Sequence, residues 1–130
     1  MAEIKISELS IGDWVQIDGE PAKALCLRIV GGHIFKGVSG QMYRCCGGDD
    51  FKPIPLTPSI LEKNGFVKNG EYDEWNIGTW QTPYLLGVSL ERPAITIKWN
   101  GSSIFIDQAK FVHQLQHALR LAGVEKEIEL

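Results

Sequence analysis

Short alternations of apolar and polar residues fill the first 56 positions of the chain and predict consecutive β-strands. Glycine-containing pairs such as Asp18-Gly19 separate these stretches, as expected for tight turns between antiparallel strands. The expected strands cover residues 12–17, 22–29, 33–38 and 41–45, and prolines make the segment 51–56 extended. Five short strands joined by tight turns indicate a small closed barrel over residues 1–56.

A short helix is expected at the border between the two halves of the chain. Thr57 suits the N-cap, Pro58 fits the first helical turn, and Gly65 can adopt the left-handed conformation that ends a helix. Asn-Gly pairs then predict hairpin turns, and the clearest strands that follow are residues 84–90, 94–99 and 102–106.

Residues 107–122 are expected to form the longest helix, capped by Asp107 and ended by Gly123. Its apolar positions recur at helical spacing and form one face that must pack on a sheet, namely Phe111, Val112, Leu115, Ala118, Leu119 and Ala122. The pattern therefore predicts an α+β chain with two subdomains. A small β-barrel of residues 1–56 packs against residues 57–130, an antiparallel sheet covered by the helix 107–122.

Composition narrows the class of protein. The chain has 130 residues, 44% of them hydrophobic, and 13 basic against 16 acidic residues give a net charge of −3. These values exclude disorder and coiled coil, and they disfavour a general DNA-coating protein. No apolar run approaches the ~20 residues of a membrane span, and the first residues lack the pattern of a signal peptide. An odd number of cysteines favours a reducing compartment, so we expect a cytoplasmic protein that contacts no membrane.

The cysteines do not form a convincing metal site. Cys45 and Cys46 are adjacent on an expected strand, so their side chains point to opposite faces of it. A zinc site needs ligands that converge on one point, usually from a tight turn. We therefore expect no metal and no cofactor.

Two histidines four residues apart, His113 and His117, lie on one side of the last expected helix. Zinc proteases use this spacing, but Gln114 replaces their glutamate and no third ligand is near in sequence. Relative to Leu115, both imidazoles are expected on the solvent side, where Lys110 and Arg120 extend a partly basic stripe. Two interpretations remain open, a solvated helix face and a contact surface for anions that strengthens at acidic pH.

A group of aromatic residues occupies a loop-rich stretch of the second half and consists of Tyr72, Trp75, Trp80 and Tyr84. Aromatic side chains outside clear periodicity can line a ligand groove or stack on bases. They can equally fill the space between two subdomains. Recognisable catalytic motifs are absent from the sequence, so no catalytic residue is assigned.

The segment from Gly12 to Val15 reads Gly-Asp-Trp-Val and resembles the first strand of SH3-like small barrels, including the Tudor and KOW types. This resemblance covers the first fifty-odd residues as topology and implies binding of peptides, nucleic acids or modified side chains. Three longer phrases, at residues 11–15, 56–66 and 112–121, resemble a family of small uncharacterised proteins of anaerobic gut bacteria and their prophages and mobile elements. That resemblance implies a cytoplasmic setting and a phage or mobile-element role, and it assigns no site residue.

The sequence thus predicts a non-enzymatic binding or adaptor module whose partner is a protein or peptide. The alternative is a nucleotide- or nucleic-acid-binding protein. Its candidate ligand-binding residues are the basic stripe and the loop aromatics, namely Lys110, His113, His117, Arg120, Tyr72, Trp75 and Trp80.

Overall fold

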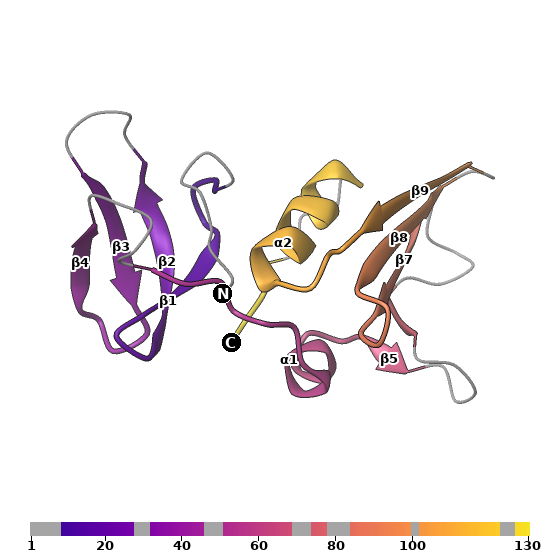
Figure 1. Ribbon diagram of the computed structural model, residues 1–130, viewed down its shortest axis with the longest axis horizontal. Coiled ribbons are helices and arrows are strands. Elements are labelled where there is room, and N and C mark those ends of the chain that lie inside the picture. The colour runs from indigo at the N-terminus through magenta and orange to yellow at the C-terminus, as the bar shows by residue number, and fades with distance from the viewer. Residues whose placement is uncertain are drawn as a thin grey trace. The chain divides into compact units, whose positions relative to one another are not determined.

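The computed structural model describes residues 9–27, 32–45, 51–68, 74–77, 84–99, 102–122 and 127–130. The chain divides into two compact units, Met1–Pro55 and Leu56–Leu130. Within the described residues, the N-terminal unit contains a four-stranded sheet, and the C-terminal unit contains a five-stranded sheet and two helices (Figure 1). The fold is therefore α+β with antiparallel sheets, as the sequence predicts.

The N-terminal sheet is an antiparallel meander in which each strand pairs with the next along the chain. Its strands are β1 (Trp14–Ile17), β2 (Glu20–Cys26), β3 (His33–Gly37) and β4 (Met42–Cys45). Asp18 and Gly19 both have positive φ, at 49° and 80°, which is the geometry of the tight turn that their sequence predicts. One face carries the core, including the fully buried Val15, Ala22 and Phe35.

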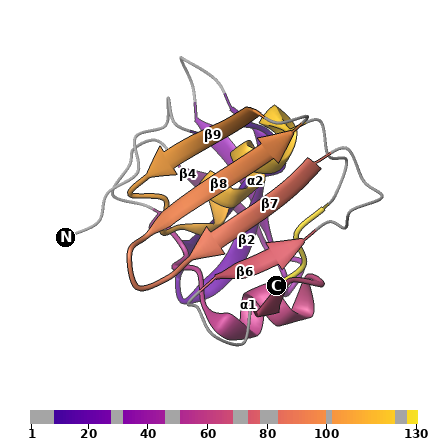
Figure 2. The ribbon, with the colours of Figure 1, turned by 90° about the vertical axis from the view of Figure 1, so that its right-hand side faces the viewer.

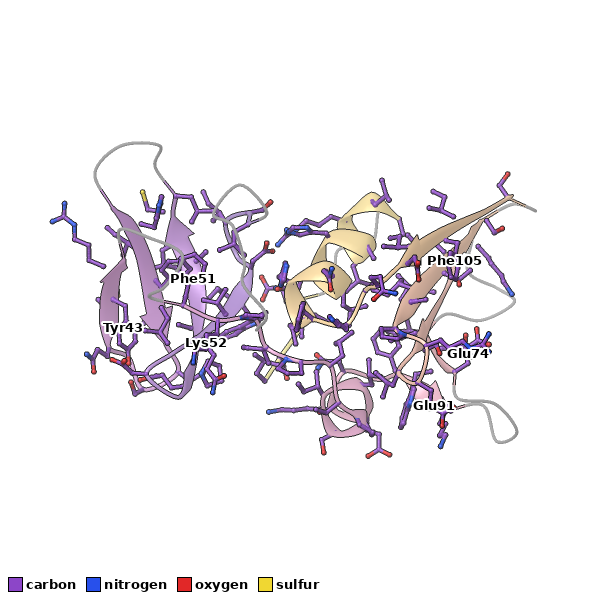
Figure 3. The ribbon with its side chains drawn as sticks, viewed as in Figure 1. Tyr43, Phe51, Lys52, Glu74, Glu91 and Phe105 are labelled. Atoms are coloured by element: carbon purple, nitrogen blue, oxygen red, sulfur yellow. The ribbon has the colours of Figure 1, made fainter. Side chains whose placement is uncertain are left out.

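The extended segment after β4 returns to β1. Lys52 forms an isolated antiparallel bridge with Gln16, with reciprocal backbone hydrogen bonds of 2.8 and 2.9 Å. Beside it, Phe51 is buried, with its ring centroid 5.3 Å from that of Phe35 (Figure 3). The expected closed barrel is wrong for the described residues, because this segment contributes a single bridge and does not pair with β4. On the side of this segment that faces away from β1, Pro53 has no N–H group with which to pair another strand.

The first helix follows its sequence signals closely. Helix α1 spans Pro58–Lys63, and the Thr57 hydroxyl oxygen accepts a hydrogen bond from the Ile60 N–H at 3.3 Å. Gly65 has a φ of 85°, which confirms the left-handed position expected just beyond the helix.

Asn64 ties the end of α1 to the last residues of the chain. Its side chain is 3% exposed, and its amide nitrogen donates to the carbonyl groups of Ile60 and Glu129, both at 2.8 Å. Its amide oxygen accepts from the Glu129 N–H at 2.7 Å. The side chain therefore pairs with Glu129 as a neighbouring strand would, and the adjacent Ile128 is buried.

The C-terminal sheet is also antiparallel with its strands in chain order. It consists of β5 (Val67–Lys68), β6 (Trp75–Ile77), β7 (Tyr84–Ser89), β8 (Ala94–Trp99) and β9 (Ser102–Asp107). Helix α2 (Val112–Leu121) lies along one face of it (Figure 1). That face contributes the buried side chains Leu86, Val88, Ile95 and Ile97.

Helix α2 is shorter than the sequence predicts. Asp107 does not cap it but ends β9, and Gln108 follows in a left-handed conformation with φ of 59°. The side-chain oxygen of Gln114 instead accepts from the N–H groups of Lys110 and Phe111, at 2.8 and 3.0 Å. The expected apolar face is confirmed in its central part, because Val112, Leu115, Ala118 and Leu119 are buried.

Candidate interaction surfaces

The two edges of the C-terminal sheet differ in length and chemistry. Strand β5 has two residues, one of which is Lys68. Strand β9 has six residues and pairs with β8 along its whole length, from Ser102 opposite Trp99 to Asp107 opposite Ala94. Within the described part of the chain, β9 has no strand on its other side (Figure 2). Short charged edges discourage further pairing, whereas a long edge with exposed apolar side chains invites it.

The apolar side chains of β9 are unusually exposed. Ile104 lies on the α2 side of the sheet opposite Ile97, yet it is 49% exposed, whereas Ile97 is buried. Phe105 lies opposite Thr96 on the other face and is 67% exposed (Figure 3). Together with the edge that no described strand covers, these exposed apolar side chains make β9 the candidate interaction site of this unit.

The sheet face opposite α2 carries a transverse row of five residues, one from each strand. Their register runs Val67, Asn76, Gly87, Thr96 and Phe105. A methyl group on Gly87 would lie 2.5 Å from Glu74 Oε1 and 3.0 Å from Asn76 Oδ1, so these oxygens rest on the β7 backbone. The middle of the row is therefore polar and has no large side chain standing out from the sheet, and the apolar residues Val67 and Phe105 lie at its two ends.

A second surface lies on the outward face of the N-terminal sheet, opposite Phe35. Four residues face each other across its four strands, in the order Trp14, Lys23, Lys36 and Met42. The Lys23 ammonium lies 5.1 Å from the Trp14 ring centroid, which is cation–π geometry. Arg44, exposed and paired with Ile34, adds a third cation to this face. We call Trp14, Lys23, Lys36 and Arg44 the cationic face.

A hydrogen-bonded cluster holds one end of the N-terminal sheet. The Tyr43 hydroxyl donates to Glu20 Oε2, and the Ser39 N–H and hydroxyl donate to the same carboxylate at 2.9–3.0 Å. The hydrogen bond from Tyr43, followed by those from Ser39, lowers the pKa of Glu20. The same bond raises the pKa of Tyr43 to about 12. These groups bind one another, so the cluster braces the β3–β4 turn.

The histidine stripe differs from its expected arrangement. His113 is 3% exposed, so its expected position on the solvent side is wrong. Its ring centroid lies 6.0 Å from that of Phe111, with the two rings nearly parallel, and 5.8 Å from that of His117, which it meets edge-on. His117 is half-buried, while Lys110 and Arg120 are exposed. The Lys110 ammonium lies 5.6 Å from the Phe111 ring.

Of the predicted aromatic binding residues, the structure describes the side chain of one. Trp75 is 4% exposed and lies on β6 opposite Val88, within the core of the C-terminal unit. Tyr72 and Trp80 lie outside the described residues. Trp75 therefore packs in the core and cannot stack on a ligand from this position.

Two kinds of feature are absent from the described residues, a cluster of metal-binding side chains and a membrane-spanning helix. Among the described residues, no group of three or more His, Cys, Asp or Glu side chains is placed to hold a metal ion. Cys26 is a half-buried free thiol, and Cys46 lies outside the described residues. No helix in the described part of the chain is long and apolar enough to cross a bilayer.

Sequence reasoning missed both surfaces described above. For β9 a signal is present in the sequence. A strand that is buried on one face alternates apolar and polar residues, whereas the run Ile104-Phe105-Ile106 is apolar on both faces. The cationic face has no local pattern in the sequence. Its residues Trp14, Lys23 and Lys36 lie on three different strands and come together only through strand pairing. Comparison of the chain with protein-family models, curated proteins and solved structures finds no match.

Proposed function

We propose that this chain is a non-enzymatic protein-interaction module that accepts an extended strand from a partner protein at the edge of β9. The observation that carries the proposal is the open six-residue edge with Ile104 and Phe105 exposed. An added strand would satisfy the outward-facing backbone groups of β9, and this main-chain pairing supplies affinity.

Side chains on the two faces of β9 would supply the specificity. Ile104 and Ile106 share one face, and Phe105 and Asp107 share the other. Because opposite residues in paired strands contact each other directly, the entering strand should be apolar across from Ile104, Phe105 and Ile106. It should carry no acidic residue across from Asp107, since like charges directly opposite each other destabilise a pair.

A peptide-display experiment tests this proposal. A library of ten-residue random peptides is selected on the wild-type protein, and the enriched peptides are measured on Phe105→Lys and Val67→Lys by fluorescence anisotropy. We expect enriched peptides with three consecutive or alternating apolar residues, and at least ~10-fold weaker binding to Phe105→Lys. Val67→Lys places the same charge on the same face at the other edge and should bind as the wild type does. Peptides that bind both variants equally would contradict the proposal.

The cationic face favours a second candidate function, the binding of single-stranded nucleic acid. Three cations and the Trp14 ring lie on one sheet face, and the outward positions described on β1 to β4 include no carboxylate. Basic side chains beside a half-buried aromatic ring on a sheet face suit phosphates with stacked bases. This candidate replaces the stripe on α2 as the nucleic-acid surface, because His113 is buried there.

Anisotropy with a labelled twelve-nucleotide single strand tests the second candidate. Binding should weaken with salt, with a log–log slope that Lys23→Ala plus Lys36→Ala reduces by about 1.4. The matched control is Lys63→Ala plus Lys98→Ala, which removes the same charge from the C-terminal unit. Binding that both double variants weaken equally would reflect net charge alone.

A further inference from the structure

We infer that the strand accepted by β9 is β9 of a second copy of this chain, so that two molecules join their C-terminal sheets edge to edge. This inference rests on the proposed role of β9 as a strand acceptor. Its carrying observation is that the β9 sequence is complementary to itself in one antiparallel register.

The register follows from centring a two-fold axis on Phe105. Phe105 then lies opposite its own symmetry mate, Ile104 lies opposite Ile106 of the other copy, and Ser103 lies opposite Asp107. The aromatic pair falls on the outer sheet face, where Phe105 is 67% exposed in the single chain. The isoleucine pairs fall on the α2 side, where Ile104 lacks the cover that Ile97 has.

Charge agrees with this register. The only ionisable side chain of β9 is Asp107, and the two-fold axis places it opposite a serine hydroxyl, which can donate to the carboxylate. A closed isologous pair also leaves both β9 edges paired from Ser103 to Asp107, so association stops at two copies. The opposite edge, β5, has two residues and a lysine and would not continue the assembly.

Sedimentation velocity over about 1–300 µM provides the first test. Joining two six-residue strands creates a small interface, so we expect a reversible dimer with a dissociation constant of about 1–100 µM. Phe105→Lys places two ammonium groups opposite each other at the axis and should weaken association at least ~10-fold. Val67→Lys, on the same face at the other edge, should dimerise as the wild type does.

Disulfide trapping tests the register itself, in a background with Cys26, Cys45 and Cys46 replaced by serine. Directly opposed residues have Cα atoms about 4.5–5.5 Å apart, which a disulfide can bridge, so Phe105→Cys should cross-link rapidly under mild oxidation. Ser103→Cys lies on the same face of the same strand. In this register its symmetry mate is about 14 Å away, so it should cross-link at least ~10-fold more slowly.

Three outcomes would overturn the inference. In the first, the wild-type protein stays monomeric up to 300 µM. In the second, Ser103→Cys cross-links as fast as Phe105→Cys. In the third, Phe105→Lys and Val67→Lys weaken association equally. A monomer that still selects peptides in the display experiment would remove the second copy as partner and leave the proposed function standing. A monomer that selects none would remove both.

Discussion

One edge strand of each sheet, β1 in the N-terminal unit and β9 in the C-terminal unit, differs in whether a described segment pairs with it. In the N-terminal unit, the backbone of Lys52 returns to β1 and pairs with Gln16 on the side away from β2. In the C-terminal unit, no described segment returns to β9, and the tail is held by the side chain of Asn64 instead. One bridge thus occupies an edge in the first unit, while a six-residue edge stays available in the second.

This difference separates folding from association. Apolar residues at a covered position, such as Phe35, stabilise the unit that contains them. Apolar residues at an uncovered edge, such as Phe105, add little to the single chain and are placed to stabilise a complex. Truncating a phenylalanine should therefore lower the free energy of unfolding in the N-terminal sheet, and should weaken association with little loss of stability at β9.

The largest expected effect comes from comparing Phe35→Ala with Phe105→Ala. Phe35 is fully buried, so its truncation should lower the free energy of unfolding of the N-terminal unit by about 3–5 kcal/mol. Phe105→Ala should change the unfolding free energy of the monomer by no more than about 0.5 kcal/mol. Urea denaturation followed by circular dichroism at low protein concentration measures both. Equal losses would show that Phe105 is covered in the folded chain.

The next effect concerns the side chain that secures the C-terminal tail. Asn64→Ala removes three hydrogen bonds from a buried position and should destabilise the C-terminal unit by about 1–3 kcal/mol. Increased amide exchange at Glu129 should accompany the loss, because its N–H would lose the Asn64 oxygen. The exposed neighbour substitution Lys63→Ala is the control, and a comparable loss there would refute the assignment.

A smaller effect is expected where the bridge closes the N-terminal edge. Lys52→Pro removes the N–H group that donates to the Gln16 carbonyl and should cost about 1 kcal/mol of unfolding free energy. Lys52→Ala keeps that N–H and should change stability by less than about 0.5 kcal/mol. If Lys52→Ala is as damaging as Lys52→Pro, the lysine side chain and not the bridge stabilises this edge.

The smallest expected effect is the pH dependence of the hydrogen bond between Tyr43 and Glu20, which braces one end of the N-terminal sheet. The pKa of Glu20 is lowered, so its bond with Tyr43 stabilises the fold above the unfolded pKa near 4.5, and this contribution is lost as pH falls through the folded pKa. The pKa of Tyr43 is raised to about 12, so the contribution is also lost as pH rises from 10 through 12. Tyr43→Phe should therefore lower Tm at pH 7 and have less effect at pH 3 and pH 12. A Tm difference independent of pH would contradict this.

Local chemistry explains which parts of the fold were predictable. The turn at Asp18-Gly19 and the cap at Thr57 each depend on residues next to one another in sequence, and the structure confirms both. The centres of β1 to β4 and β7 to β9 are also recovered, because alternation is a property of one strand. Strand β6, in contrast, lies in the stretch that the sequence predicts to be rich in loops.

Errors arise where distant or competing partners decide the outcome. The predicted start of α2 was wrong because Asp107 suits both a cap and a strand end. The helix begins at Val112, where the side chain of Gln114 binds the N–H groups of the two preceding residues, Lys110 and Phe111. The predicted exposure of His113 was wrong because the buried side of α2 is wider than its apolar stripe and includes His113 and Gln116. The open edge of β9 depends on strand order, which no local pattern contains.

The pairing of Asn64 with Glu129 has a consequence for biosynthesis. These residues are 65 positions apart, and the buried amide of Asn64 gains its tail partner only when position 129 has left the ribosome. The N-terminal sheet, by contrast, has its last strand contact at Lys52. Chains being translated should therefore carry a finished first unit while the second still exposes apolar surface, so chaperones are most needed between the emergence of Lys52 and that of Glu129.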